Sequence, residues 1–169
     1  MENKDSTCHP RSFRSLYDQY SDALRNFVYY RSGDNGFAED VAQESFLRLW
    51  KNCVNVPYEK AKSFLYTVAH NLILDRAKHH QVELKFRALP KQTTDTQHPE
   101  FLLEEQEFKA KLEQAINALP ENQRVVFLMN RIDKMKYREI AQTLGLSQKA
   151  VEKRMHKALL FLRTTIGNI

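Results

Sequence analysis

The stretch 137–162 constrains the fold most strongly, because its apolar residues follow two helical repeats separated by a glycine. The first set recurs at steps of three and four residues, which places it on one helix face: Tyr137, Ile140, Ala141 and Leu144. Gly145 can end that helix in the left-handed conformation, and Ser147 can cap the next helix. The inward residues of this next helix are Val151, Met155, Ala158, Leu159 and Leu162. The spacing therefore predicts a helix-turn-helix.

The second of these helices has a polar, mainly basic outer face. Its members are Gln148, Lys149, Glu152, Lys153, His156 and Lys157, with Arg154 beside them. From Gly145 onward the basic residues are opposed only by Glu152, and their surplus nearly equals the formal net charge of +5. Such a face can enter a major groove, where Lys and Arg attract phosphates. The alternative is a solvated Lys-rich face, but the cap, the glycine turn and the preceding helix favour DNA binding.

The composition favours helices throughout. Only four glycines and five prolines occur in 169 residues, and 42% of the residues are hydrophobic, enough for compact cores. Apolar periodicity predicts three helices in the first half of the chain and further helices before the helix-turn-helix. Between them lies a polar stretch flanked by Pro90 and Pro99. We therefore predict an all-α fold with two small helical domains, 8–80 and 101–167, joined by a flexible linker, 81–100.

Nothing in the sequence indicates secretion, a membrane span or enzymatic chemistry. No apolar run suits a signal peptide or a bilayer-spanning helix, so we expect a cytoplasmic protein without membrane insertion. Cys8 and Cys53 are accordingly expected to stay reduced, with no disulfide. The histidines His9, His79 and His80 match no metal-ligand spacing, so no metal or cofactor is expected. No catalytic triad, Cys-His pair or phosphate loop occurs, so we expect no enzyme.

The second helix of the first domain combines acidic and aromatic residues. Its polar side carries Glu39, Asp40, Gln43, Glu44 and Arg48. With Phe46 and Trp50, this side would suit a basic protein partner. An equally good interpretation is that both rings pack in the core and the acids are solvated.

The third helix has the pattern of a nucleic-acid surface. Asn71, Asp75 and Lys78 share one face, with His70, Arg76 and His79 nearby. Exposed rings beside that face, from Tyr58, Phe64 and Tyr66, can stack on unpaired bases. The alternative for these rings is core packing, which is favoured for Phe64, whereas Tyr58 lies in a loop.

Four segments together resemble the extracytoplasmic-function (ECF) group of the sigma-70 family. Residues 38–50 (AEDVAQESFLRLW) resemble its core-binding region 2.2, and residues 64–75 (FLYTVAHNLILD) resemble the promoter-melting and −10-recognition regions that follow. Residues 118–124 (ALPENQR) are similar to the start of region 4. EIA at 139–141 and LGLS at 144–147 match its helix-turn-helix.

The resemblance implies a transcription initiation factor that binds bacterial core RNA polymerase at its clamp helices and directs it to −10 and −35 promoter elements. The implied polymerase contacts are Asp40, Gln43, Glu44, Phe46, Leu49 and Trp50. The implied −10 contacts are Tyr58, Phe64, Tyr66, His70, Asn71, Asp75, Lys78 and His79, with a base captured by the loop before Phe64. The implied −35 contacts are Gln148, Lys149, Glu152, Lys153, Arg154, His156 and Lys157. The resemblance also implies an anti-sigma partner, which in this group is often membrane-bound.

Three positions depart from the family pattern. Phe64 and Lys78 stand where the family often has Trp and Arg, and each keeps the chemical type. Ala150 stands where Thr is common, which removes a hydroxyl that could bind phosphate. The competing class is a repressor or a response-regulator-like protein, which would bind duplex DNA as a dimer without polymerase.

Overall fold

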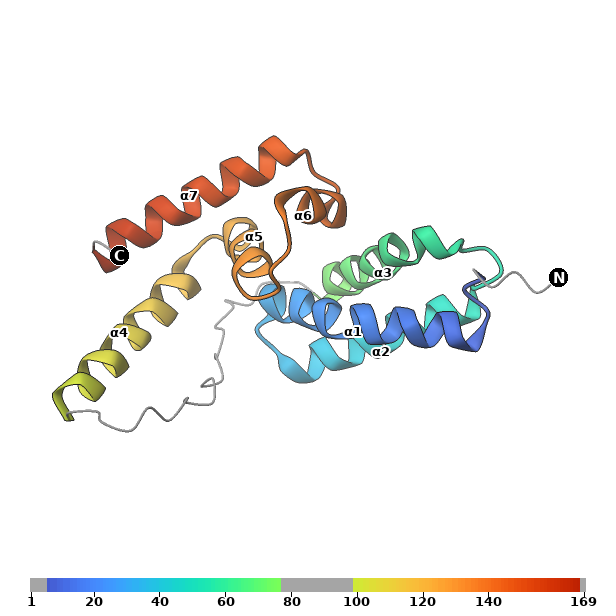
Figure 1. The fold of residues 1–169 in the computed structure, drawn as a ribbon, viewed down its shortest axis with the longest axis horizontal. Coiled ribbons are helices and arrows are strands. Elements are labelled where there is room, and N and C mark those ends of the chain that lie inside the picture. Colours follow the sequence, from blue (N-terminus) through green and yellow to red (C-terminus); the bar gives the residue numbers. More distant parts are fainter. Residues whose placement is uncertain (1–5, 77–98, 168–169) are drawn as a thin grey trace.

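The structure is a computed structural model that describes residues 6–76 and 99–167. Within those ranges it contains seven α-helices, one short 3-10 turn and no strand. The first lobe consists of α1 (Pro10–Ser32), α2 (Asn35–Lys51), the turn η1 (Tyr58–Lys60) and α3 (Ala61–Arg76). The second lobe consists of α4 (Pro99–Ala118), α5 (Glu121–Arg131), α6 (Tyr137–Leu144) and α7 (Gln148–Ile166) (Figure 1). The prediction of an all-α fold is confirmed.

Local signals set the ends of the first two helices. Pro10 begins α1, where its missing N–H costs nothing, and Gly33 ends α1 in the left-handed conformation at φ 69°. The Gly33 N–H donates to the carbonyl of Tyr29. Asp34 then caps α2, because its carboxylate accepts a hydrogen bond from the Phe37 N–H at 3.0 Å. The resulting tight connection makes α1 and α2 antiparallel neighbours, which pack against α3.

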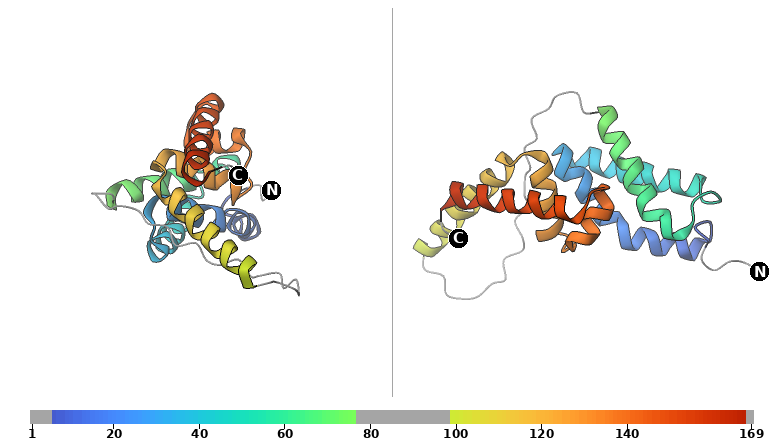
Figure 2. Two further views of the ribbon diagram at one scale, coloured as in Figure 1. Left: turned by 90° about the vertical axis from the view of Figure 1, so that its left-hand side faces the viewer. Right: turned by 90° about the horizontal axis from the view of Figure 1, so that it is seen from above.

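The two lobes pack against each other. The carboxyl-terminal part of α1 meets α5, and α3 meets α6, as the views in Figures 1 and 2 show. Asn26 donates a 2.7 Å hydrogen bond to Asp133, and Arg31 forms a 2.7 Å ion pair with Glu121. Each contact joins the first lobe to the second.

A buried arginine completes the contact between the lobes. The side chain of Arg124 is 4% exposed and donates to three carbonyl oxygens, those of Tyr30, Asn117 and Leu119. The Tyr30 carbonyl belongs to the first lobe, whereas the other two lie at the end of α4. Burial lowers the pKa of Arg124, although Glu121 acts in the opposite direction. Its three acceptors offset part of the cost of removing this charge from water.

The expectation that Cys8 and Cys53 remain unpaired is wrong, since they form a disulfide with a Cα–Cα distance of 4.9 Å. The two cysteines are 45 residues apart along the chain, so the sequence does not show that they lie close together in space. Antiparallel packing of α1 and α2 returns the end of α2 to the start of α1, where the two cysteines lie. The expected location of the protein gives no information about which cysteines the fold brings together.

Candidate nucleic-acid and protein interfaces

The helix-turn-helix is built as the sequence predicts. Gly145 follows α6 with φ 65° and ψ 36°, and its N–H donates to the carbonyl of Ala141. Ser147 caps α7 by accepting a 3.1 Å hydrogen bond from the Ala150 N–H. Ile140 is fully buried and holds α6 against the rest of the second lobe. The turn therefore fixes the direction in which α7 leaves α6.

The outer face of α7 is open to solvent. Its exposed side chains are Gln148, Lys149, Glu152, Lys153, His156 and Lys157. The opposite face is buried at Val151, Met155, Ala158 and Leu162. Gln148 donates a 3.1 Å hydrogen bond to Glu152, which leaves the lysines directed outward as the main charges of this face. A row of lysines on an exposed helix face suits contact with phosphates.

Arg154 differs from the other predicted −35 residues. Its side chain is half-buried and lines a cavity of about 470 Å³ between the lobes. The first lobe contributes Phe27, Arg31, Tyr66 and His70 to the same cavity. In this arrangement Arg154 faces the first lobe rather than the outer face of α7.

Some of the predicted polymerase contacts on α2 are exposed and others are buried, and the exposed side is called the α2 surface below. Asp40 and Gln43 are exposed, and Glu44 accepts a 2.7 Å ion-pair hydrogen bond from Arg48. Trp50 is 43% exposed, whereas Phe46 and Leu49 are 4% and 0% exposed. Phe46 and Leu49 therefore lie in the core beneath this surface.

An aromatic cluster supports Trp50 from below. The Phe13 ring lies 5.0 Å from the Trp50 ring and 6.0 Å from the Phe46 ring, in edge-to-face geometry. Tyr17 packs at 4.9 Å from Phe46 and is itself 46% exposed. Edge-to-face pairs add stability beyond the area they bury. The cluster thus holds one face of Trp50 and leaves the rest available to a partner.

The predicted −10 residues also differ in their exposure to solvent. Asn71 and Asp75 are exposed on α3, while Phe64 and Tyr58 are half-buried. Tyr66 is 3% exposed, so its ring packs in the core and is not free to stack on a base. Burial raises the pKa of the Tyr66 hydroxyl. Lys78 and His79 lie outside the described residues.

His70 forms a contact that connects α3 to the boundary between the lobes. Its Nδ1 lies 2.6 Å from Nη1 of Arg31, the same arginine that pairs with Glu121 of the second lobe. Burial, and after it the positive charge of Arg31, lowers the pKa of His70, so the neutral imidazole is favoured. The neutral ring can accept the hydrogen bond from Arg31.

The contacts between the lobes include residues that sequence patterns did not reveal. Asp133 lies in the turn after α5 and accepts hydrogen bonds from Asn26 at 2.7 Å and from the Tyr30 hydroxyl at 3.3 Å. Burial raises the pKa of Asp133, although both hydrogen bonds act to lower it. No sequence pattern reveals this site, because its members are more than 100 residues apart.

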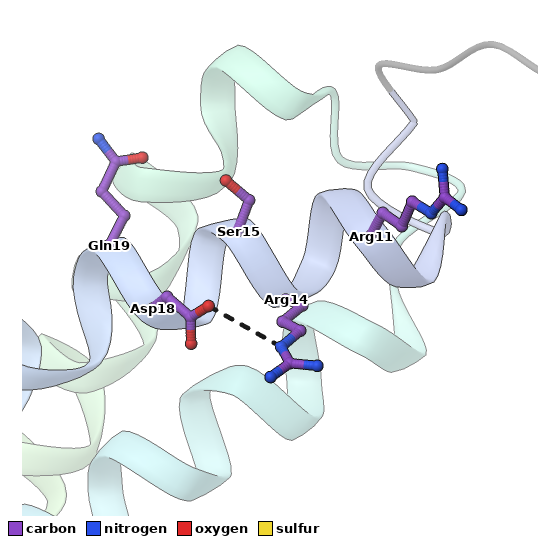
Figure 3. Close-up of a pocket in the computed structure, with 5 residues that line it drawn as sticks. All are labelled: Arg11, Arg14, Ser15, Asp18 and Gln19. Atoms are coloured by element: carbon purple, nitrogen blue, oxygen red, sulfur yellow. Dashed lines mark ion pairs between the residues drawn. The ribbon is translucent and has the colours of Figure 1, made fainter.

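A shallow hollow on α1 has no features of a binding site. It is lined by Arg11, Arg14, Ser15, Asp18 and Gln19, and Figure 3 shows that all five side chains project from this one helix. Arg14 and Asp18 form only a long ion pair of 3.9 Å. A single exposed helix face cannot enclose a ligand.

Comparison with known proteins identifies the family. The sigma-70 region 2 model matches residues 16–82, and the sigma-70 region 4 model matches residues 109–162. The chain is 28% identical over 156 residues to the ECF RNA polymerase sigma factor SigE of Mycolicibacterium smegmatis, covering 90% of this chain and 60% of SigE. It is 29% identical over 163 residues to the ECF RNA polymerase sigma factor SigL of Mycobacterium tuberculosis, covering 92% of this chain and 89% of SigL.

The chain belongs to the ECF group of the sigma-70 family. It is therefore an RNA polymerase sigma factor that initiates transcription, and it is not an enzyme. Region 2 corresponds to the first lobe, and region 4 contains the helix-turn-helix. This assignment replaces the alternative of a repressor that acts without polymerase.

A solved structure has the same fold as this sigma factor. CnrH, in complex with the cytosolic domain of CnrY, superposes with a TM-score of 0.63 at 20% sequence identity, covering 95% of this chain and 91% of that chain. At that identity the similarity supports the fold alone.

Two features are absent from the part of this sigma factor that the structure describes. No helix within 6–76 or 99–167 is long and apolar enough to cross a bilayer. Over the same residues, no three His, Cys, Asp or Glu side chains gather as a metal site would require.

Proposed function

We propose that this sigma factor binds core RNA polymerase through the α2 surface and directs it to promoters with distinct −10 and −35 elements. We assign 8–80 to polymerase and −10 binding, 81–100 to the linker and 101–167 to −35 binding. The exposed basic face of α7, presented by a capped helix-turn-helix, is the observation that supports promoter reading most directly.

The polymerase contact is assigned to the exposed part of the α2 surface. Asp40, Gln43 and Glu44 supply polar and acidic groups on the amino-terminal side of the half-exposed Trp50 along the same helix. An aromatic ring that packs against its own protein and lies close to charged groups is a typical hot spot of a protein interface. Phe46 and Leu49 are buried in the core beneath this surface, and the Phe13 ring contacts both Phe46 and Trp50. The proposed partner surface is basic and belongs to the polymerase clamp helices.

The −10 element is assigned to the exposed side of α3 and the turn before it. Asn71 and Asp75, with Lys78 and His79 further along the chain, would face the DNA strand, and Tyr58 and Phe64 would hold an unstacked base. Tyr66 has a supporting role, because its ring is buried against Phe27 at 5.2 Å. His70 becomes available to DNA when its contacts near the second lobe open.

The −35 element is assigned to the outer face of α7. Lys149, Lys153 and Lys157 would attract phosphates, while Gln148, Glu152 and His156 offer polar groups to base edges in the major groove. Arg154 would join them only after the lobes separate, because it faces the first lobe in this structure.

Promoter binding requires the lobes to separate. The −10 and −35 elements are about 25 base pairs apart, or about 85 Å along B-DNA at 3.4 Å per base pair. Lobes joined by direct contacts such as Asn26–Asp133 cannot reach both elements at once. We therefore propose that the packed arrangement is a resting form in which the boundary between the lobes masks Arg154 and His70.

We also propose that an anti-sigma factor, often membrane-bound in this group, controls this protein in the cytoplasm. The structure of CnrH is a complex with the cytosolic domain of CnrY, and the structure of RpoE of Bartonella quintana is a complex with the anti-sigma factor NepR. A protein covering the α2 surface or the α7 face would block polymerase or DNA.

Two variants test the assignment of surfaces. Trp50→Ala should weaken binding to core polymerase by about 30-fold or more, the loss expected of a hot-spot aromatic. Phe108→Ala is the matched control, since Phe108 is 45% exposed but lies on α4. Equal affinities of the two folded variants would contradict the polymerase assignment.

For the DNA surface, Lys153→Glu should abolish transcription from promoters that need a −35 element while polymerase binding persists. Lys109→Glu makes the same charge change on the exposed surface of α4 and should leave transcription intact. An unaltered −35 footprint with Lys153→Glu would refute the assignment of α7.

A further inference from the structure

The disulfide Cys8–Cys53 joins the start of α1 to the end of α2. In Figure 1 the start of α1 lies at the end of the first lobe that is far from the second lobe. Cys8 immediately precedes His9, the N-cap of α1, and Cys53 lies in the turn that follows α2. Both cysteine residues are half-buried rather than buried, so the bridge lies near the surface of the lobe, where thiol–disulfide exchange with small molecules can take place.

The two chain segments stay adjacent through a contact that does not involve sulfur. Thr7 is 1% exposed, and its hydroxyl donates a 2.8 Å hydrogen bond to the carbonyl of Val56. Thr7 is the neighbour of Cys8, and Val56 follows Cys53 by three residues. This buried hydrogen bond keeps the thiols near each other when the S–S bond is open, which favours its formation again.

Cys8 lies at the positive end of a helix. It immediately precedes the N-cap of the 23-residue helix α1, whose first turn has no acidic residue. Arg11 projects from that first turn, as Figure 3 shows. The positive end of a helix dipole and an arginine attract negative charge, and a thiolate is the nucleophile in thiol–disulfide exchange. Cys8 is therefore the attacking sulfur, and Cys53 is the resolving one.

The disulfide is linked to the proposed polymerase contact through Trp50. The Cys53 N–H donates to the carbonyl of Trp50 at 3.3 Å, and Phe13, one turn into α1, holds the Trp50 ring at 5.0 Å. The S–S bond thus ties together the two segments that carry this ring pair. Closing the bond limits the motion of Trp50 relative to α1.

We propose that Cys8 and Cys53 form a reversible oxidation site that adjusts the affinity of this sigma factor for polymerase. The inference rests on the proposed polymerase role of Trp50 and on the proposed cytoplasmic location, where thiols are normally kept reduced. Before oxidation the protein is then the dithiol, and an oxidant converts it to the disulfide seen here. A disulfide in such a compartment is characteristic of redox sensing.

The oxidant is a small-molecule disulfide such as oxidised glutathione. The Cys8 thiolate attacks one glutathione sulfur, which forms a mixed disulfide and releases one glutathione thiolate. The Cys53 thiol loses its proton and attacks the Cys8 sulfur, which releases the second glutathione. In balance, one protein dithiol and one oxidised glutathione give one protein disulfide and two reduced glutathiones. Reduced glutathione or a protein dithiol reverses the reaction.

The oxidised form binds polymerase more tightly, because the bond orders Trp50 before the partner arrives. Fixing one such side chain in advance corresponds to an affinity gain of about 3- to 10-fold. The test begins with the intact protein in glutathione buffers of graded oxidised-to-reduced ratio. Thiol trapping and mass spectrometry then measure the fraction of Cys8–Cys53 bonded. Binding to core polymerase is measured on the same samples, with the variant Cys8→Ser as the control.

We expect the bonded fraction to rise reversibly with the oxidised-to-reduced ratio, and affinity to rise with it in the natural protein but not in Cys8→Ser. A second variant, Cys53→Ser, should trap the mixed disulfide of Cys8 with glutathione. If the pair never oxidises across these buffers, or if both redox forms bind equally, the inference is overturned while the polymerase role stands. If neither form binds polymerase, the proposed function itself fails, and the inference fails with it.

Discussion

Removing the carboxylate of Asp133 should shift this sigma factor from packed toward separated lobes. Asp133 accepts two hydrogen bonds from the first lobe, of which the 2.7 Å bond from Asn26 is the stronger by length. A hydrogen bond to a charged group contributes about 1.5–3 kcal/mol. Burial of the carboxylate offsets part of this, as the raised pKa of Asp133 indicates. The net loss in Asp133→Ala should therefore be about 1–2 kcal/mol, a rise of about 5- to 30-fold in the ratio of separated to packed protein.

A double-mutant cycle isolates the contact between the lobes. Asn26→Ala alone, Asp133→Ala alone and the combination are compared in the oxidised protein. Spin labels at the exposed positions Glu39 and Gln114, on different lobes, report the two populations through their distance distribution by pulsed electron paramagnetic resonance. Asp22→Ala is the matched control, because the ion pair of Asp22 among the described residues is with Arg25 on the same helix, at 3.3 Å.

The cycle should give a coupling energy of about 1–2 kcal/mol between positions 26 and 133, with no shift in the control. A coupling energy near zero, or an Asp133→Ala distribution identical to that of the natural protein, would refute the reasoning. The side chains would then touch without stabilising the packed form.

Two further predictions concern stability. Gly145→Ala should cost about 1–2 kcal/mol, because a residue with a Cβ is disfavoured at φ 65°. This holds even though no described residue other than its chain neighbours has an atom within 4 Å of the added carbon. Gly36 lies inside α2, where an added Cβ would be 3.5 Å from Oδ1 of Asp34. Gly36→Ala should therefore leave the stability of the protein unchanged or raise it slightly. Thermal melts that rank Gly145→Ala and Gly36→Ala the other way would contradict this account. Because burial and then Arg31 lower the pKa of His70 below its ordinary value of about 6.5, the neutral ring stabilises the fold above that pH. That stability should be lost as the pH falls below about 6.5, and the melting temperature should fall with it. His70→Gln should flatten this fall in melting temperature. Parallel profiles of melting temperature against pH for the two proteins would rule out the role of His70.

Short-range patterns predicted the helix-turn-helix and the two faces of α7 correctly. Gly145 and Ser147 act through their own backbone conformation and their hydrogen bonds to nearby residues, which depend on the local sequence alone. The six polar residues of the outer face follow from helical periodicity once Val151 and Met155 are taken as buried. Such features need no knowledge of the rest of the fold.

Periodicity was less informative for aromatic residues, because these can be buried or exposed on the same helix. Phe46 and Trp50 are one helical turn apart, yet one is in the core and the other is 43% exposed. Tyr66, predicted as a stacking ring, is buried against Phe27. Arg154, predicted to face DNA, turns toward the first lobe. Each outcome depends on which element packs nearby, and the sequence does not state this.

The sequence by itself determined the helices, their caps and the basic outer face of α7, since these depend on interactions between residues a few positions apart. Only the tertiary structure decided the pairing of Cys8 with Cys53, the contact of Asn26 with Asp133 and the burial of Arg124. Cys8–Cys53 and Asn26–Asp133 join residues 45 and 107 positions apart. Their geometry follows from how α1 packs against α2 and α5, because helix packing brings distant residues together without any local sequence signal.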